Sequence, residues 1–314
     1  MELNRRSFLK GAGLLTLGGI LMPETTLAAS SKKYAKTKKT IGLQTYSLGP
    51  ELSGNKVAEG LRRLRSMGYK NLELAGYNGA GQVGGIAMKE WKKMVDDAGL
   101  KVVSSHMNPS LGRGEKYGKE TAGKISDYWK RACDDHAVFN MPFIVQPGLP
   151  SISSIEDAQA VAEIFNKAGE ISKGYKMQWG YHNHDREFGR VTAGGNHVNT
   201  DRGAREGRQI EEIFINETDA DKVAIELDVY WCVMGREDPV EWIDKYAKRI
   251  QLLHIKDRLV LGQSGMMNFE QIFNHFYANG HDTFFVEVED IGSGKQMERV
   301  EKSAQYLIDS KFVK

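Results

Sequence analysis

Beyond residue 39 the chain alternates between short apolar runs and longer segments with an amphipathic pattern. The short runs are rich in valine, isoleucine, leucine and phenylalanine and span four to six residues, which is typical of buried strands. They predict strands at residues 41–46, 71–74, 101–106, 143–146, 178–182, 223–228, 250–255 and 284–289.

The longer segments repeat apolar residues every three to four positions, as the buried face of a helix does. They predict helices at residues 57–67, 89–98, 120–136, 155–172, 206–215, 239–247, 269–278 and 296–309. A strand followed by a helix, repeated eight times, predicts parallel strands with right-handed crossovers. The expected fold is therefore an α/β protein with one closed (β/α)8 TIM barrel.

An open, doubly wound sheet would show the same alternation. Such sheets bind a nucleotide at a glycine-rich turn after the first strand, and no G-x-G-x-x-G pattern follows residues 41–46. In a closed barrel, the loops that follow the strands all lie at the C-terminal face, where active sites are built. The longest of these loops are residues 76–85, 108–119, 188–205 and 258–267.

The start of the chain differs from the rest. Arg5 and Arg6 precede an apolar stretch at residues 11–22, and small residues follow it. This order is typical of a twin-arginine export signal, and the stretch is shorter than the roughly 20 residues that a membrane span needs. The expected division is a signal peptide at residues 1–29, a linker at 30–39 and the barrel at 40–314, with a periplasmic location for the mature protein.

Charge and cysteine content limit the range of partners. The chain has 43 basic and 41 acidic side chains and a formal net charge of +2. No basic stripe suited to nucleic acid occurs, so we expect a small-molecule substrate and no nucleic-acid partner. Cys133 and Cys232 lie in no zinc-binding pattern, and the sequence does not decide whether they form a disulfide. We expect no stable membrane span after signal removal, and a homo-oligomer is compatible with the sequence.

Polar side chains stand at the ends of strands that are otherwise apolar. They are Glu73, His106, Gln146, the run at 181–187, Glu226, Asp228, His254, Lys256, Asp257, Glu287 and Glu289. In a parallel barrel the strand ends meet at one mouth, so these side chains form a ring. Burying so many ionisable groups is costly unless they pair or bind a cation. The mixture of carboxylates and imidazoles predicts one divalent metal, with Mn²⁺, Mg²⁺, Co²⁺ and Zn²⁺ all open.

Four motifs lie in order on the last four strands. They are Y-H-N-H-D-x-E-F at residues 181–188, E-L-D-x-Y-W at 226–231, L-H-I-K-D at 253–257 and F-V-E-V-E at 285–289. With these motifs the chain resembles the xylose isomerase-like barrel superfamily over about residues 39–313. The resemblance is to its sugar isomerases and epimerases, a branch that includes the tagatose/psicose 3-epimerases and the inosose dehydratases.

The resemblance implies a set of metal ligands. In that superfamily a carboxylate, an Asp, a His and a Glu from strands five to eight hold the metal. By motif, these ligands fall on Glu187, Asp228, His254 and Glu287. Glu187 and Glu287 would also be the paired catalytic acid and base. His184 is an alternative ligand on the fifth strand.

Other polar residues of the mouth have competing structural and functional interpretations. The residues predicted to bind substrate are His106, His184, Lys256 and Trp231. A packing role is the alternative for His106 and Trp231. His182 shares a strand face with His184, and we expect it beside the metal rather than bound to it. Glu226 is expected to be the buried partner of a neighbouring strand.

The resemblance implies a divalent-metal-dependent sugar isomerase or epimerase that acts through an enediolate. We expect a non-phosphorylated sugar or keto-sugar, because phosphorylated sugars are cytoplasmic and no phosphate-binding turn is evident. A 3-keto-glycoside lyase or dehydratase with the same chemistry is the alternative. Two weaker alternatives are a metal-dependent phosphodiesterase or endonuclease, which needs a basic groove, and a non-catalytic sugar-binding protein, which needs no acid and base.

Overall fold

The structure, a computed structural model, describes residues 34–112, 114–201, 206–289 and 292–314. The predicted signal peptide lies outside these ranges. Eight parallel strands form one sheet, and each overlaps one of the eight predicted runs. They are β1 (Ile41–Gln44), β2 (Tyr69–Leu74), β5 (Lys101–Ser105), β6 (Phe143–Gln146), β7 (Gln178–His182), β10 (Val223–Asp228), β11 (Ile250–Lys256) and β12 (Thr283–Glu287).

The sheet curls into a nearly closed barrel. Its strand order is β5-β2-β1-β12-β11-β10-β7-β6, so each strand lies beside its neighbours in the repeat. The two ends of the sheet meet where His106 bridges Val145 in parallel. There the backbone N–H of Met107 also donates to the Val145 carbonyl at 2.9 Å. The predicted (β/α)8 fold class is therefore confirmed.

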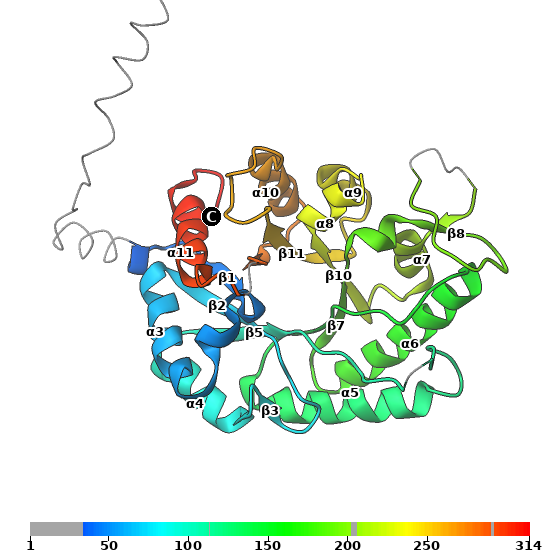
Figure 1. Cartoon of the computed structure of the whole chain (residues 1–314), viewed down its shortest axis with the longest axis horizontal. Coiled ribbons are helices and arrows are strands. Elements are labelled where there is room, and N and C mark those ends of the chain that lie inside the picture. Colours follow the sequence, from blue (N-terminus) through cyan, green and yellow to red (C-terminus); the bar gives the residue numbers. More distant parts are fainter. Residues whose placement is uncertain (1–33, 113, 202–205, 290–291) are drawn as a thin grey trace, which may run out of the picture.

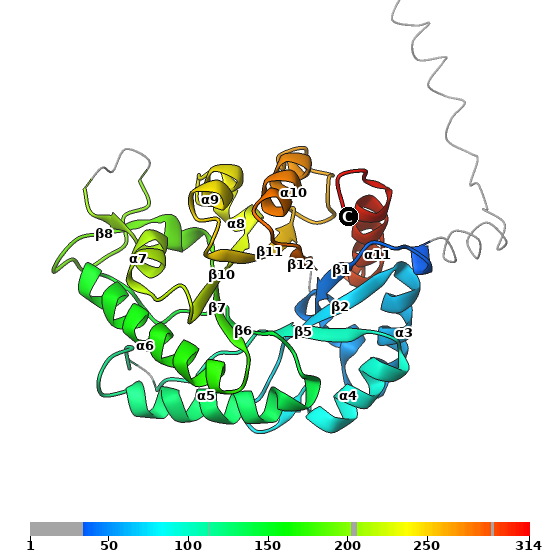
Figure 2. The same ribbon diagram turned by 180° about the vertical axis from the view of Figure 1, so that it is seen from behind.

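Helices cover the outside of the barrel in chain order (Figures 1 and 2). They are α3 (Val57–Met67), α4 (Met88–Asp97), α5 (Ala122–His136), α6 (Ile155–Gly174), α7 (Ile210–Glu217), α9 (Pro239–Lys245), α10 (Phe269–Ala278) and α11 (Gln296–Asp309). Of these, α3, α10 and α11 have the predicted limits. Within the described residues no helix is long and apolar enough to cross a bilayer.

Short elements in the connections between the strands and the helices were not predicted, because they are too brief to show a period. They are η1 (Thr45–Leu52), η2 (Gly54–Lys56), η3 (Ala137–Phe139), η4 (Asp185–Phe188), α8 (Val229–Met234) and the hairpins β3 (Gln82–Val83) with β4 (Ile86–Ala87) and β8 (Arg190–Val191) with β9 (Arg208–Gln209). Because β9 pairs with β8, α7 begins at Ile210 rather than at residue 206. Because η1 starts at Thr45, β1 ends two residues before its predicted limit.

The larger core lies between the barrel and its helices. Phe165 of α6 is fully buried, and its ring centroid lies 4.6 Å from that of Trp179 and 5.1 Å from that of Tyr181. Aromatic rings at these separations bury large apolar area and add specific edge and stacking contacts. Cys133 and Cys232 are buried and free, so no disulfide joins them.

A smaller core fills the barrel interior and supports the mouth. We call it the apolar plug; its members are Val103, Ala224, Leu252 and Phe285. Phe285 occupies space that a side chain at Gly42 would need, since a Cβ on Gly42 would lie 2.6 Å from its Cδ1. Interior layers of this kind make a barrel a packed core rather than a pore.

Replacement of Phe285 by Ala should lower the free energy of unfolding by about 3–5 kcal/mol, because the plug has no other large ring to fill the cavity. Urea unfolding followed by tryptophan fluorescence measures the change. Tyr46→Ala is the matched control, since Tyr46 is 48% exposed and its loss should change stability by less than about 0.5 kcal/mol. An equal loss of unfolding free energy in both variants would mean that the plug does not stabilise the barrel.

Candidate functional site

The candidate site forms the layer above the apolar plug. Side chains two residues apart on a strand share a face. Residues two and four positions after the plug residues of β10 and β11, and two positions after that of β12, therefore also face the interior. These residues are Glu226, Asp228, His254, Lys256 and Glu287, and each is at most 6% exposed. The fold thus gathers charged side chains from three neighbouring strands in one buried layer.

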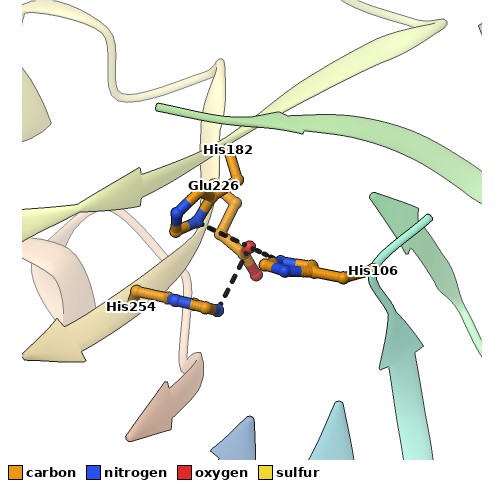
Figure 3. A group of neighbouring side chains, drawn as sticks. All are labelled: His106, His182, Glu226 and His254. Carbon is orange, nitrogen blue, oxygen red and sulfur yellow. Dashed lines mark hydrogen bonds and ion pairs between the residues drawn. The ribbon is translucent and has the colours of Figure 1, made fainter. Parts of the chain in front are cut away.

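The deeper part of this layer is a cluster of three imidazoles around one carboxylate (Figure 3). We call it the inner group; its members are His106, His182, Glu226 and His254. The Oε2 atom of Glu226 lies 2.7 Å from His106 Nε2, 3.2 Å from His182 Nδ1 and 3.3 Å from His254 Nε2. The pairing of β7 with β10 places His182 directly opposite Glu226 and explains their contact.

A second carboxylate, Glu73 of β2, joins the inner group from the opposite side of the barrel. Its Oε2 lies 2.6 Å from His254 Nε2 and 3.1 Å from His106 Nε2, and it accepts a hydrogen bond from Gln44 Nε2 at 2.8 Å. The rings of His106 and His254 stack with centroids 5.0 Å apart. The inner group is therefore a continuous hydrogen-bonded network across the barrel.

Nearer the mouth, four side chains present ligand atoms within 4.8 Å of one another. We call them the outer group; they are His182, Asp228, His254 and Glu287. His254 Nδ1 lies 3.5 Å from Glu287 Oε2 and 4.0 Å from Asp228 Oδ2. Three of these residues are predicted metal ligands, and the structure brings all three together.

The outer group suits a divalent cation. Asp228 Oδ2 and His254 Nδ1 are buried and have no hydrogen-bond partner among the described residues. Buried polar atoms are nearly always paired, so two such atoms facing one space indicate a missing partner. Two imidazoles and two carboxylates are a donor set that Mn²⁺, Co²⁺ or Zn²⁺ accepts readily.

The protonation behaviour of the layer agrees with this fit. Burial raises the pKa of Asp228 to about 6. It also raises the pKa of Glu226 to about 7, an effect to which the Glu73 carboxylate adds. Burial lowers the pKa of His254, but Glu226 and Glu73 outweigh it and bring this pKa well above its ordinary value. The layer therefore attracts protons, and a bound cation would compete with them for the same atoms.

Lys256 closes one side of the outer group. Its Nζ lies 3.0 Å from Glu287 Oε2 and 2.7 Å from Glu289 Oε1, and 4.6 Å from the centre of the Trp231 ring. Burial alone would lower the pKa of Lys256. The carboxylates of Asp228, Glu287 and Glu289 outweigh this effect and raise the pKa above its ordinary value. Lys256 is thus a fixed positive charge beside an aromatic wall.

Glu187 is the predicted ligand that belongs to neither group among the described residues. It lies in η4, where its Oε2 accepts a hydrogen bond from the backbone N–H of His184 at 2.6 Å. Burial raises the pKa of Glu187. His184 and Glu187 instead line a cavity of about 300 Å³ at the ends of β6 and β7.

The other predicted substrate residues lie around the groups. The His184 ring is 5.1 Å from that of His182 and 5.8 Å from that of Trp231, so it stands at the border between the outer group and the cavity. His106 belongs to the inner group, beneath the outer one. The expectation that Glu226 is a buried partner of a neighbouring strand agrees with its contacts to His106 and His182.

The sequence interpretation placed His182 and Glu73 at the mouth but predicted neither as a metal ligand. The signal for His182 was its strand parity, which turns it inward together with His184. The signal for Glu73 was its place at the end of a strand whose other residues are apolar. Neither signal gave the strand register that brings these side chains to Glu226 and His254.

Comparison with known proteins agrees with the predicted resemblance. A family profile described as xylose isomerase-like TIM barrel matches residues 61–310. A crystal structure of a sugar phosphate isomerase/epimerase from Parabacteroides distasonis is 48% identical, covers 88% of this chain and 96% of its own, and superposes with a TM-score of 0.81. The comparison with curated proteins gave no significant match.

More distant structures share the fold. An L-ribulose 3-epimerase is 15% identical over 86% of this chain and 93% of its own, with a TM-score of 0.64. A 3-keto-D-glucoside 4-epimerase from E. coli is 17% identical over 86% of this chain and 98% of its own, also with a TM-score of 0.64. By its matched profile and its 48% identical relative, the chain belongs to the xylose isomerase-like TIM barrel family, as a protein of the sugar isomerase/epimerase type.

Proposed function

We propose that this protein is a divalent-metal-dependent isomerase or epimerase of a non-phosphorylated sugar or keto-sugar. The observation that carries the proposal is the outer group, in which Asp228 Oδ2 and His254 Nδ1 are buried without a hydrogen-bond partner among the described residues. His182, Asp228, His254 and Glu287 would hold the cation. On this geometry, His182 takes the place that the motif assigned to Glu187.

A divalent cation held there would polarise a carbonyl and its neighbouring hydroxyl and make the adjoining C–H acidic. Glu287 would remove that proton, since its carboxylate reaches the outer group and lies near the mouth. The partner acid that returns a proton is proposed to be Glu187, whose raised pKa suits a proton donor. Lys256 would hold Glu287 in place through their 3.0 Å contact and donate to a substrate oxygen.

The buried charges support a substrate without a phosphate group. Among the described residues, the buried basic side chains are Lys256 and Arg249. Lys256 is already bound to two carboxylates, and Arg249 donates to Thr218 and to backbone carbonyls between α7 and β10. Neither is free to bind a phosphate, which is best held by unpaired donors. Trp231 offers a ring face against which a sugar would pack.

A 3-keto-glycoside lyase is the second candidate, because removal of the same proton can be followed by loss of a group from the next carbon. The structural neighbour that acts on a 3-keto-D-glucoside favours testing oxidised glycosides as well as free sugars.

Metal content should depend on the Asp228 carboxylate. Asp228→Ala and Asp228→Asn should each lower bound metal at least about tenfold, because both remove a charged ligand. Asn keeps the cap of α8, where Asp228 Oδ1 accepts from the Trp231 N–H at 2.8 Å, so it separates a ligand role from a capping role. The control is Asp238→Ala, which removes the same kind of cap from α9. Elemental analysis measures the metal; full occupancy in both Asp228 variants would remove Asp228 from the metal site.

Hydrogen exchange at carbon should reveal the reaction. Metal-loaded protein in D2O should place deuterium on the carbon beside the carbonyl of its substrate, and NMR of keto-sugars and oxidised glycosides should detect the exchange. Protein stripped with a chelator, and Glu287→Gln protein reloaded with metal, should leave that position protonated. An eliminated group would identify the lyase. If metal-loaded protein exchanges no C–H of any sugar that it binds, it is a binding protein rather than an isomerase.

We also propose export to the periplasm by the twin-arginine route, on the order of charged, apolar and small residues in the first 29 positions. Replacing Arg5 and Arg6 together by Lys should leave the unprocessed chain in the cytoplasm, as cell fractionation with mass measurement would show. The matched control replaces the adjacent exposed pair Arg62 and Arg63 of α3 by Lys. Normal processing of the first variant would contradict this route.

A further inference from the structure

Glu73 lies beneath the outer group without belonging to it, and its strongest contact is with a predicted metal ligand. Its Oε2 is 2.6 Å from His254 Nε2. We propose that Glu73 is a positioning residue, which fixes the orientation and the tautomer of His254 so that Nδ1 faces the cation. The inference rests on the proposed metal site and explains how one of its ligands, His254, is oriented.

The two nitrogens of His254 face different surroundings. Nε2 lies against Glu73 Oε2, whereas Nδ1 lies 3.5 Å from Glu287 Oε2 and has no hydrogen-bond partner among the described residues. A neutral imidazole carries one N–H and one lone pair, and an ionised carboxylate only accepts hydrogen bonds. A His254 ring that binds a cation is neutral, so its one hydrogen belongs on Nε2 and the Nδ1 lone pair is directed at the outer group.

Glu73 is itself held by a fixed donor. Gln44 Oε1 accepts from the backbone N–H of Tyr46 at 3.0 Å, which settles which end of the amide is oxygen. Gln44 Nε2 then donates to Glu73 Oε2 at 2.8 Å. Gln44 Nε2 and His254 Nε2 thus both donate to Glu73 Oε2, from opposite sides. Because Gln44 holds this oxygen in place, the His254 ring has one favoured orientation.

The alternative is that the inner group holds a second cation. His254 Nε2 would then have to bind that ion, while Nδ1 binds the first. Both nitrogens of a single ring would be metal-bound, and Glu73 would lose the N–H that its 2.6 Å contact requires. The observed spacing favours a carboxylate that orients an imidazole ligand, a common arrangement around bound metals.

The test uses the full mature chain labelled with ¹⁵N in histidine and loaded with ¹¹³Cd²⁺, which is diamagnetic. In the wild type, His254 should couple to cadmium through Nδ1 and show a hydrogen-bonded proton on Nε2. Glu73→Gln should shift or broaden that proton signal and weaken Cd²⁺ affinity about 10–100-fold, measured by competition with a chelator. Glu73→Asp, which keeps the charge, should restore part of both.

Two variants separate positioning from loss of charge or of fold. Glu226→Gln removes a charge 3.3 Å from the same nitrogen, but its closest contact is with His106, so the His254 Nε2 proton should remain. Glu211→Gln changes another fully buried glutamate, on α7, and should leave both readouts as in the wild type.

The outcomes are distinct. Coupling of His254 to cadmium through Nε2 would overturn the positioning role alone. A second ion per chain that is lost in Glu73→Gln would assign the inner group to metal and overturn it as well. If the wild type binds no Cd²⁺, Zn²⁺ or Mn²⁺, the metal proposal fails and takes this inference with it. A Glu73→Gln chain that folds and matches Glu211→Gln in both readouts would also overturn it.

Discussion

The structure depends on how charged side chains are neutralised in a layer that is almost completely buried. Glu73, Glu226, Asp228 and Glu287 bring four carboxylates into the barrel interior, and all are at most 6% exposed. Isolated charges at such depth would cost several kcal/mol each. The layer contains Lys256 and three imidazoles as counterparts. Four of its polar atoms still lack a hydrogen-bond partner among the described residues: Glu73 Oε1, Glu226 Oε1, Asp228 Oδ2 and His254 Nδ1. That shortfall favours a cation as part of the folded, active protein.

This layer is possible because the one beneath it is dry and closely packed. Phe285 fills the barrel interior against the backbone of Gly42. The carboxylates and imidazoles above it therefore rest on a packed apolar layer and are open only toward the mouth. In such surroundings a hydrogen bond between ionised groups is short and directional. Contacts of 2.6 and 2.7 Å around His254 and His106 are of this kind. The rigidity of the site therefore comes from the plug below as much as from the ligands themselves.

The sequence was sufficient to predict the strands and three of the four residues of the outer group, for a physical reason. Each apolar run has to be buried on both faces, so its limits are visible, and Asp228, His254 and Glu287 come at or just before the ends of such runs. The fifth strand was different. β7 ends at His182, and the chain then enters η4, where Glu187 folds back onto the backbone of His184. Strand parity stops at that turn, so the motif alone could not tell which of three side chains reaches the centre.

Asp228 links the proposed metal site to the aromatic wall formed by Trp231. Its Oδ1 accepts the N–H of Trp231 and so begins α8, while its Oδ2 faces the outer group. Any shift of this carboxylate toward a cation would pull on the first turn of α8, which carries the Trp231 ring and its contact with Lys256. Lys256 in turn binds Glu287, which belongs to the outer group. A cation would therefore order the aromatic wall together with its own ligands. The Asp228 carboxylate links the two, because one oxygen holds the start of α8 and the other faces the outer group.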